Sequence, residues 1–175
     1  MNEFYHVSQC DLSKITQFDL RFFKERFTNE KHIDYIVKNH PNGISQHGGI
    51  YLYANTSQMH PKLIAIETVF ELVRKLKFKH RKSRFEVTFG CETLEEAIKI
   101  KTETFEGKGE IYKVSCDRYT IADMNLLKIE GSVIDFQLLA EKYWNGQESA
   151  DPIWEVLMEN PVNILEKVNV VNVKP

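Results

Sequence analysis

The strongest constraint on the fold is a change in the spacing of apolar residues between residues 61 and 98. From Pro61 to Lys77 apolar side chains recur at steps of three and four, which is typical of an amphipathic helix. From Phe85 to Phe89 they alternate with polar ones, which is the period of a half-buried strand. Thr93 and Glu96 then form a capping box that begins another helix. This succession indicates a mixed fold.

The rest of the chain is less regular. Asp135 is the expected N-cap of a helix through Trp144, and Gly146 is placed to end that helix. The tail from 160 to 173 predicts one strand with a bulge or two short strands, and 117–130 is ambiguous. The other segments are expected to be strands at 3–8, 50–53 and 110–115, helices at 17–27 and 30–39, and a loop at 40–49.

The order of these elements bears on the fold class. Strands alternate with helices only irregularly, and the clearest strands lie in the second half of the chain. This order favours an α+β fold over a doubly wound parallel sheet. Because neither an internal repeat nor a linker rich in Pro, Gly or Ser divides the sequence, residues 1–175 are expected to form a single domain.

Composition excludes several classes of function. Lys and Arg number 23 against 25 Asp and Glu, a net charge of −2, which argues against a polycation that coats nucleic acid. Cys10, Cys91 and Cys116 lack the spacing of a disulfide framework or a four-cysteine zinc site, so no metal is expected. The sequence shows neither a signal-peptide pattern nor an apolar run of about 18 residues. It therefore predicts a reduced, cytoplasmic protein with no membrane partner.

Common strong motifs such as Walker A, GxGxxG, HExxH and GxSxG are absent from the sequence, so the candidate residues rest on weaker patterns. The first is His6 on the strand at 3–8. Because side chains alternate along a strand, His6 shares a face with Ser8, and the two could present hydrogen-bonding groups to one ligand. The alternative is a histidine whose ring is satisfied by backbone groups.

The second pattern is Ser83 beside Arg84, where a hydroxyl and a guanidinium fork suit a phosphate or pyrophosphate. The alternative is that Arg84 only ends the solvated basic run that begins at Arg74. That run, 74–84, is the third pattern, and it could contact a nucleic-acid backbone. Phe78 is the single aromatic residue of this run, so it lacks a surface on which bases could stack. The alternative is a solvated helix end whose positive charge complements the helix dipole.

The fourth pattern is Glu155, which lies between Trp154 and the apolar pair Val156 and Leu157. Burial of a carboxylate among such neighbours could shift it into a functional state. The alternative is an exposed glutamate in a loop or a short helix.

Taken in order, these patterns resemble the three-motif layout of the ADP-ribosyltransferase superfamily: a histidine on the first strand, a polar-aromatic strand before a capped helix, and a late glutamate. More narrowly, the chain is similar to a family of small bacterial and phage proteins grouped with that superfamily. The matching segments are FYHVS at 4–8, ETVFELVR at 67–74, SRFEVTF at 83–89 followed by ETLEEA, YW at 143–144 with Gly146, and PIWEVLMENPVNILEKV at 152–168.

The resemblance implies a split, mostly antiparallel two-sheet core with NAD⁺ in a cleft between the sheets. It assigns Glu155 as the catalytic carboxylate and His6 as the residue that hydrogen-bonds the adenosine ribose. Tyr5 and Ser8 would flank the dinucleotide, and the Ser83–Arg84 pair could hold its pyrophosphate. Phe85 or Phe89 would stack on nicotinamide, where many relatives have tyrosine.

The implied activity is glycosyl transfer: mono-ADP-ribosyl transfer from NAD⁺ to a protein or nucleic-acid acceptor, or cleavage of NAD⁺. A fixed carboxylate near the ribose favours the positive charge that develops there. Such an enzyme could serve as a toxin or effector, a phage factor or a housekeeping enzyme. Two alternatives stay open: a catalytically inactive scaffold that binds protein or RNA, and an enzyme like the RNA 2′-phosphotransferases, which would need the basic side chains of 74–84.

Overall fold

Two antiparallel sheets and five α-helices make up the computed structural model, which describes residues 1–24, 29–53, 57 and 59–169. The four-stranded sheet has the order β1 (Asn2–Ser8), β4 (Glu110–Cys116), β7 (Val162–Val168) and β2 (Gln17–Phe18), and the three-stranded sheet has the order β3 (Val87–Gly90), β6 (Trp154–Glu159) and β5 (Tyr119–Asp123). The helices are α1 (Glu30–Asn39), α2 (Gln46–Tyr51), α3 (Pro61–Lys77), α4 (Leu94–Glu103) and α5 (Val133–Trp144).

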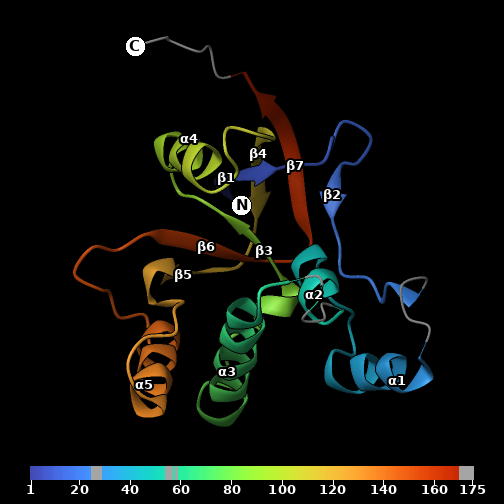
Figure 1. Ribbon diagram of the computed structural model, residues 1–175. Coiled ribbons are helices and arrows are strands. Elements are labelled where there is room, and N and C mark those ends of the chain that lie inside the picture. Colours follow the sequence, from blue (N-terminus) through green and yellow to red (C-terminus); the bar gives the residue numbers. More distant parts are fainter. Residues whose placement is uncertain (25–28, 54–56, 58, 170–175) are drawn as a thin grey trace.

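The elements form an upper and a lower half (Figure 1). The four-stranded sheet and α4 lie in the upper half, the three-stranded sheet crosses the middle, and α1, α2, α3 and α5 lie below it. The two sheets are joined where β1 meets the end of β3, because Tyr5 and Cys91 exchange backbone hydrogen bonds of 2.9 and 2.8 Å. Gly90 permits this approach, since a Cβ there would lie 2.9 Å from the carbonyl oxygen of Tyr5.

Two large apolar clusters fill the molecule on either side of β6. Val156 and Met158 point from one face of β6 into the cluster between the sheets, together with Phe4, Val114 and Val162. Leu157 points from the other face into the cluster made with α3 and α5, which includes Phe70, Phe136, Ala140 and Trp144. Since burial of apolar surface is the main stabilising contribution to a fold, these clusters fix the position of every strand in the smaller sheet.

The structure confirms the helices with the clearest end signals. Pro61 begins α3 and Lys77 ends it, and the capping box of Thr93 and Glu96 is formed at the start of α4. The strands at 3–8 and 110–115 are confirmed as β1 and β4, and 30–39 is α1. For α5 the predicted N-cap was wrong: Ser132 is the N-cap, and Asp135 is the third residue of its capping box.

The prediction of a helix at 17–27 was wrong for the residues that the structure describes, and 25–27 lie outside them. Gln17 and Phe18 instead form β2, which pairs with β7. The phenylalanines have helical spacing but pack in different clusters: Phe18 lies against the cluster between the sheets, and Phe23 packs with Ile36 and Ile44. Two separate packing contacts thus imitate the pattern of one helical face.

Further corrections concern short elements. Residues 46–51, predicted as loop and strand, form α2 with Ser45 as N-cap. The strand predicted at 85–89 begins only at Val87, because Arg84–Glu86 form the 3₁₀ turn η2. The ambiguous 117–130 contains β5 and the 3₁₀ turn η3 (Met124–Leu126). The tail forms one strand, β7, whose pairing with β4 skips Leu165 as a bulge; residues 170–173 lie outside the described part.

Among the described residues, none of the helices has both the length and the apolar character needed to cross a membrane.

Candidate functional site

Arg84 lies at the centre of a buried cluster of charged side chains. Its Nε donates to both carboxylate oxygens of Glu67, at 3.2 and 3.1 Å. Its Nη1 donates to Glu155 Oε1 at 2.6 Å and to the hydroxyl oxygen of Tyr143. The Tyr143 hydroxyl in turn donates to Glu155 Oε1 at 2.6 Å. We call these four residues the Arg84 cluster.

Four separate elements place these side chains. Glu67 points inward from α3, three residues before the core residue Phe70, and Tyr143 points inward near the end of α5. Glu155 is on β6 and, by strand alternation, shares the helix-facing side with Leu157. Arg84 begins η2. The side chains of Arg84, Glu67 and Glu155 are 7%, 7% and 6% exposed, so their charges are largely removed from water.

Burial and pairing act against each other on these groups. Burial acts to raise the pKa of Glu67, but Arg84 and a hydrogen bond from His47 outweigh it and lower that pKa to about 2. Burial acts to lower the pKa of Arg84, but Glu155 and Glu67 hold it well above its usual value. Burial raises the pKa of Tyr143 well above its usual value. With both carboxylates ionised, the cluster carries one net negative charge.

The pairing of Glu67 predicts an acid-sensitive fold. An unfolded chain protonates this carboxyl near 4.5, whereas the folded one holds off the proton until about 2. The stabilisation is therefore present above about pH 5 and is lost as pH falls toward 2, a loss of about 3 kcal/mol by linkage. Urea denaturation between pH 3 and 7 measures it.

Glu67→Gln should remove this part of the pH dependence, and Glu95→Gln, at an exposed position in the first turn of α4, should leave it unchanged. Equal pH dependence of Glu67→Gln and the unmodified protein would contradict the assignment.

A line of partly exposed rings borders the cluster. The guanidinium carbon of Arg84 lies 4.6 Å from the centre of the Phe89 ring. The His47 ring lies 4.8 Å from that of Phe89 and 4.4 Å from that of Tyr51. His47 Nε2 is 3.1 Å from Glu67 Oε1. These rings give the cluster an apolar border that suits a flat, aromatic ligand.

His6 approaches the same place from the other sheet. Its Nδ1 donates to the Phe89 carbonyl oxygen at 2.7 Å, which leaves Nε2 as a free acceptor in the neutral ring. Burial lowers the pKa of His6, against the effect of this hydrogen bond, and so favours the neutral ring. The His6 ring also meets Phe18 edge-on at 4.9 Å. We call the rings of Phe89, His47 and Tyr51 the aromatic face.

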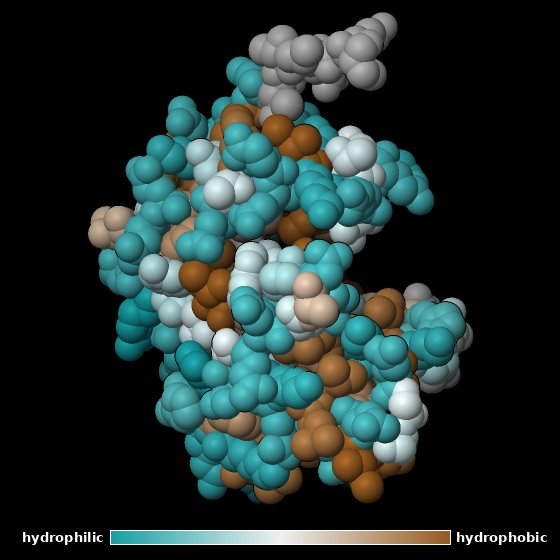
Figure 2. Space-filling model, turned by 90° about the vertical axis from the view of Figure 1, so that its left-hand side faces the viewer, coloured by the Kyte–Doolittle hydropathy of each residue, from teal (hydrophilic) through white to brown (hydrophobic). Residues whose placement is uncertain are grey.

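Three polar atoms of Arg84, Glu155 and His6 have unused hydrogen-bonding capacity. Arg84 Nη2, Glu155 Oε2 and His6 Nε2 have no partner among the described residues, and none of them is a fully buried atom. Figure 2 shows an indentation at the right-hand edge of the molecule, between its upper and lower parts. The three atoms are the donor and the acceptors that a bound ligand could use.

The structure brings three of the expected residues together, Arg84, Phe89 and Glu155, and His6 is bound to the backbone carbonyl of Phe89. Their arrangement differs from the expected cleft between the sheets, because apolar side chains fill that space. Arg84 and Glu155 lie instead on the helix-facing side of the smaller sheet, around its edge strand β3. Glu155 is neither in a loop nor in a helix, and Arg84 is not the end of a solvated run.

Four other expected residues have different surroundings. Tyr5 packs in a cluster with Cys91 and Ala97, away from the rings. The Ser8 hydroxyl donates to the carbonyl of Cys10 in the turn after β1. The Ser83 hydroxyl donates to Glu71 at 2.9 Å rather than facing a ligand. Phe85 is buried, and its ring stacks with His47 at 6.3 Å, so it supports the aromatic face from behind.

Sequence reasoning missed several members of the site, among them Glu67, Tyr143, His47 and Tyr51. Glu67 carried a usable signal, because a carboxylate on the apolar stripe of a helix, three residues before Phe70, requires a buried partner. Tyr143 and His47 carried none, because their roles come from contacts with distant segments. No group of three metal-binding side chains occurs among the described residues.

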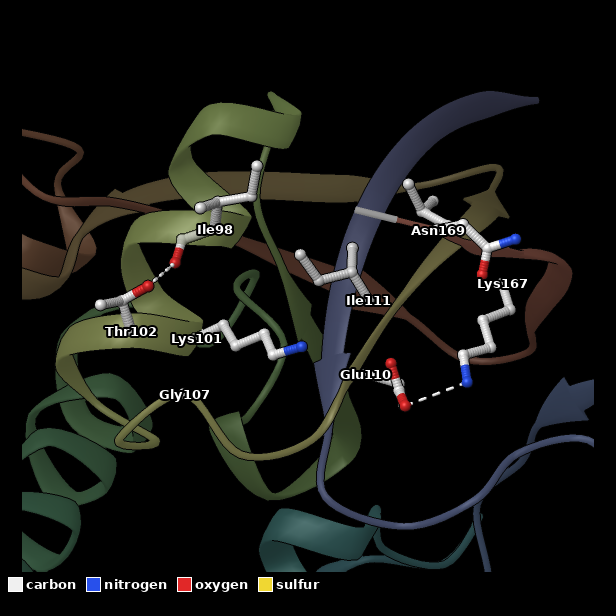
Figure 3. A pocket seen from close by; sticks show the side chains of 9 residues that line it. Ile98, Lys101, Thr102, Gly107, Glu110, Ile111, Lys167 and Asn169 are labelled. Carbon is white, nitrogen blue, oxygen red and sulfur yellow. Dashed lines mark hydrogen bonds and ion pairs between the residues drawn. The ribbon is translucent and has the colours of Figure 1, made fainter. Parts of the chain in front are cut away.

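A separate cavity of about 410 Å³ lies beside α4 and the ends of β4 and β7 (Figure 3). Lys101, Lys167 and Glu110 line it, and Lys167 pairs with Glu110 at 3.0 Å. The cavity shares no residue with the Arg84 cluster. It therefore adds nothing to the site.

The chain was compared with known proteins. A family model described as "Protein of unknown function (DUF2441)" matches residues 1–170. No curated protein matches the chain. The matched range includes both sheets, all five helices and every member of the Arg84 cluster and the aromatic face.

Proposed function

The chain belongs to the DUF2441 family of proteins of unknown function, and we propose that it is an NAD⁺-dependent enzyme that transfers ADP-ribose to a protein or nucleic-acid acceptor. One observation carries the proposal. Glu155 is fixed through Oε1 by two donors, while its Oε2 has no hydrogen-bond partner among the described residues. A carboxylate held in this way can face a developing positive charge without reorganising. The proposal includes the ADP-ribosyltransferase-like fold that the sequence motifs resemble.

The residues present fit a dinucleotide. The faces of Phe89 and His47 suit a nicotinamide or adenine ring. His6 Nε2 can accept a hydrogen bond from a ribose hydroxyl, because Nδ1 is occupied by the Phe89 carbonyl. Arg84 Nη2 is one donor for the pyrophosphate, whereas the rest of the guanidinium is engaged by carboxylates. The expected role of Arg84 is therefore reduced to a single hydrogen bond.

The reaction breaks the bond between the ribose C1′ and the nicotinamide nitrogen, and the electron pair leaves on that nitrogen. Positive charge builds on the ribose in the transition state. The cluster has one negative charge more than Arg84 compensates, and Glu155 is its member with a free oxygen. In a site with little water, this charge is worth more than it would be in solution. Glu155 is thus assigned the catalytic role.

One observation favours the alternative of an inactive binding module. The charges of Arg84 and Glu155 already satisfy each other, and the Glu155 side chain is only 6% exposed. An RNA 2′-phosphotransferase-like activity has less support, because Arg74, Lys77 and Arg84 of the basic run are each paired with a glutamate. The binding module is therefore the second candidate.

Titration calorimetry with NAD⁺ distinguishes the two candidates. We expect NAD⁺ to bind, and Phe89→Ala to weaken binding about tenfold through lost stacking. Phe105→Ala is the matched control, because Phe105 follows α4 outside the site. Absence of NAD⁺ binding, together with RNA binding that weakens steeply with salt, would instead establish the binding module. If NAD⁺ binds, mass spectrometry of a lysate incubated with NAD⁺ and the protein would identify the acceptor by its gain in mass.

A further inference from the structure

We propose that His47 is the base that takes the proton of the acceptor, and that the acceptor group is a hydroxyl; this inference rests on the proposed ADP-ribosyl transfer. His47 was not among the residues expected from the sequence. The His47 side chain is 19% exposed. It pairs with the carboxylate of Glu67, whose side chain is buried and only 7% exposed.

The fold places the His47 ring against Glu67. The backbone N–H of Ser45, the N-cap of α2, donates to the Phe85 carbonyl at 2.8 Å. Gly48 lies so close to the same carbonyl that a Cβ would be 2.4 Å from its oxygen. Helix α2 therefore rests directly on η2. His47, the residue before Gly48, is held with its Nε2 3.1 Å from Glu67 Oε1.

The contact with Glu67 fixes which nitrogen of the ring is free. An ionised carboxylate only accepts hydrogen bonds, so the neutral His47 ring has its hydrogen on Nε2. The lone pair is then on Nδ1, which has no partner among the described residues and is not a fully buried atom. A carboxylate bound to one nitrogen of an imidazole makes the other nitrogen a better base and stabilises the cation that forms.

The other groups around His47 do not compete for the proton. Tyr51 from its own helix, Phe89 from β3 and Phe85 from η2 contact the ring as aromatic neighbours. Arg84 lies behind Glu67 and holds it ionised. Glu155 is bound to Arg84 and Tyr143 rather than to His47. We therefore assign the two roles to different residues: Glu155 faces the ribose charge, and His47 takes the proton.

The step balances as follows. The acceptor oxygen forms a bond with C1′ while the bond from C1′ to nicotinamide breaks, and its electron pair leaves on the nicotinamide nitrogen. The hydroxyl proton moves to His47 Nδ1, and the imidazolium later gives it to water. A carboxylate acceptor has no proton to lose and would gain nothing from this base. The geometry therefore favours a hydroxyl, of which water is the simplest case.

The test measures nicotinamide release from NAD⁺ by the full chain, with methanol added as a second hydroxyl acceptor. We expect both ADP-ribose and its methyl glycoside to form. His47→Ala and His47→Gln should lower kcat for both products by about 10²–10⁴, the usual contribution of a general base. Added imidazole should restore part of the rate of His47→Ala. His80→Ala, at an exposed position, is the control.

The outcomes separate the two proposals. If the unmodified protein neither binds nor cleaves NAD⁺, the proposed function fails and this inference fails with it. If it cleaves NAD⁺ and the His47 variants keep the rate, only the assignment of His47 is overturned. Nitrogen NMR gives a readout without substrate: we expect the Nε2–H tautomer for His47, and the Nδ1–H tautomer would also overturn the assignment.

Discussion

Replacing Arg84 with methionine is expected to lower the free energy of unfolding by about 3–5 kcal/mol, the usual cost of removing one partner from a buried ion pair. The carboxylates of Glu67 and Glu155 would then stay buried without the cation that pairs with both of them. Such a loss is a large part of the stability of a domain of this size. Guanidinium chloride denaturation, followed by fluorescence of the two tryptophans, measures it.

The control for this variant is Arg118→Met. Arg118 also pairs with a glutamate, at 3.0 Å, but its side chain is 75% exposed. Exposed pairs contribute about 0–1 kcal/mol, so this variant should be close to the unmodified protein. Adding Glu67→Gln and Glu155→Gln to Arg84→Met should recover part of the stability, since no unpaired charge is left. An equal loss in the free energy of unfolding for Arg84→Met and Arg118→Met would show that the buried Arg84 cluster stabilises the fold no more than an exposed ion pair does.

Replacing Glu155 with glutamine is expected to lower the rate of ADP-ribosyl transfer by about 10²–10³, typical of losing one electrostatic contact in the transition state. The fold should persist. The amide oxygen can take the place of Oε1, which accepts from both Arg84 and Tyr143, and the amide nitrogen then takes the free position of Oε2. The substitution thus removes the negative charge while it keeps the internal hydrogen bonds.

Transfer of labelled ADP-ribose, or nicotinamide release, measures this effect, and denaturation verifies that the variant is folded. Glu159→Gln is the matched control, since Glu159 ends the same strand and pairs only with the exposed Arg118. Undiminished activity of a folded Glu155→Gln variant would remove the catalytic role from Glu155, and with it the main support for the proposed function.

The helices that could be predicted from the sequence are those whose own residues mark where they begin and which face is apolar. Helix α3 begins at Pro61 and has a long apolar stripe, and α4 has a complete capping box, so local chemistry defines both. Helix α2 could not be predicted, because Gly48 and Gly49 are poor helix formers. It is stabilised by contact with Phe85 rather than by its own residues.

The same distinction applies to the site. Arg84 stood out because its guanidinium lies beside the Ser83 hydroxyl, and Glu155 because it lies among large apolar neighbours. Their pairing could not be predicted, since Glu155 lies 71 residues from Arg84 in the chain and Glu67 lies 17 residues away. His47 depends on the packing of α2 and had no local signal at all. Residue types therefore indicated where charge is buried, and only the tertiary structure shows which charges meet.

The pairing of β1 with β4 sets an order of events during synthesis. Every residue of β1 pairs with one that is made about a hundred residues later, from Glu110 to Cys116. At the usual pace of translation this interval is on the order of ten seconds. Until β4 is made, the only backbone pairing that the described residues give the strand with Phe4 and His6 is that of Tyr5 with Cys91, so most of its backbone groups have no partner. A chaperone that holds the growing chain would therefore have its largest effect before β4 emerges from the ribosome.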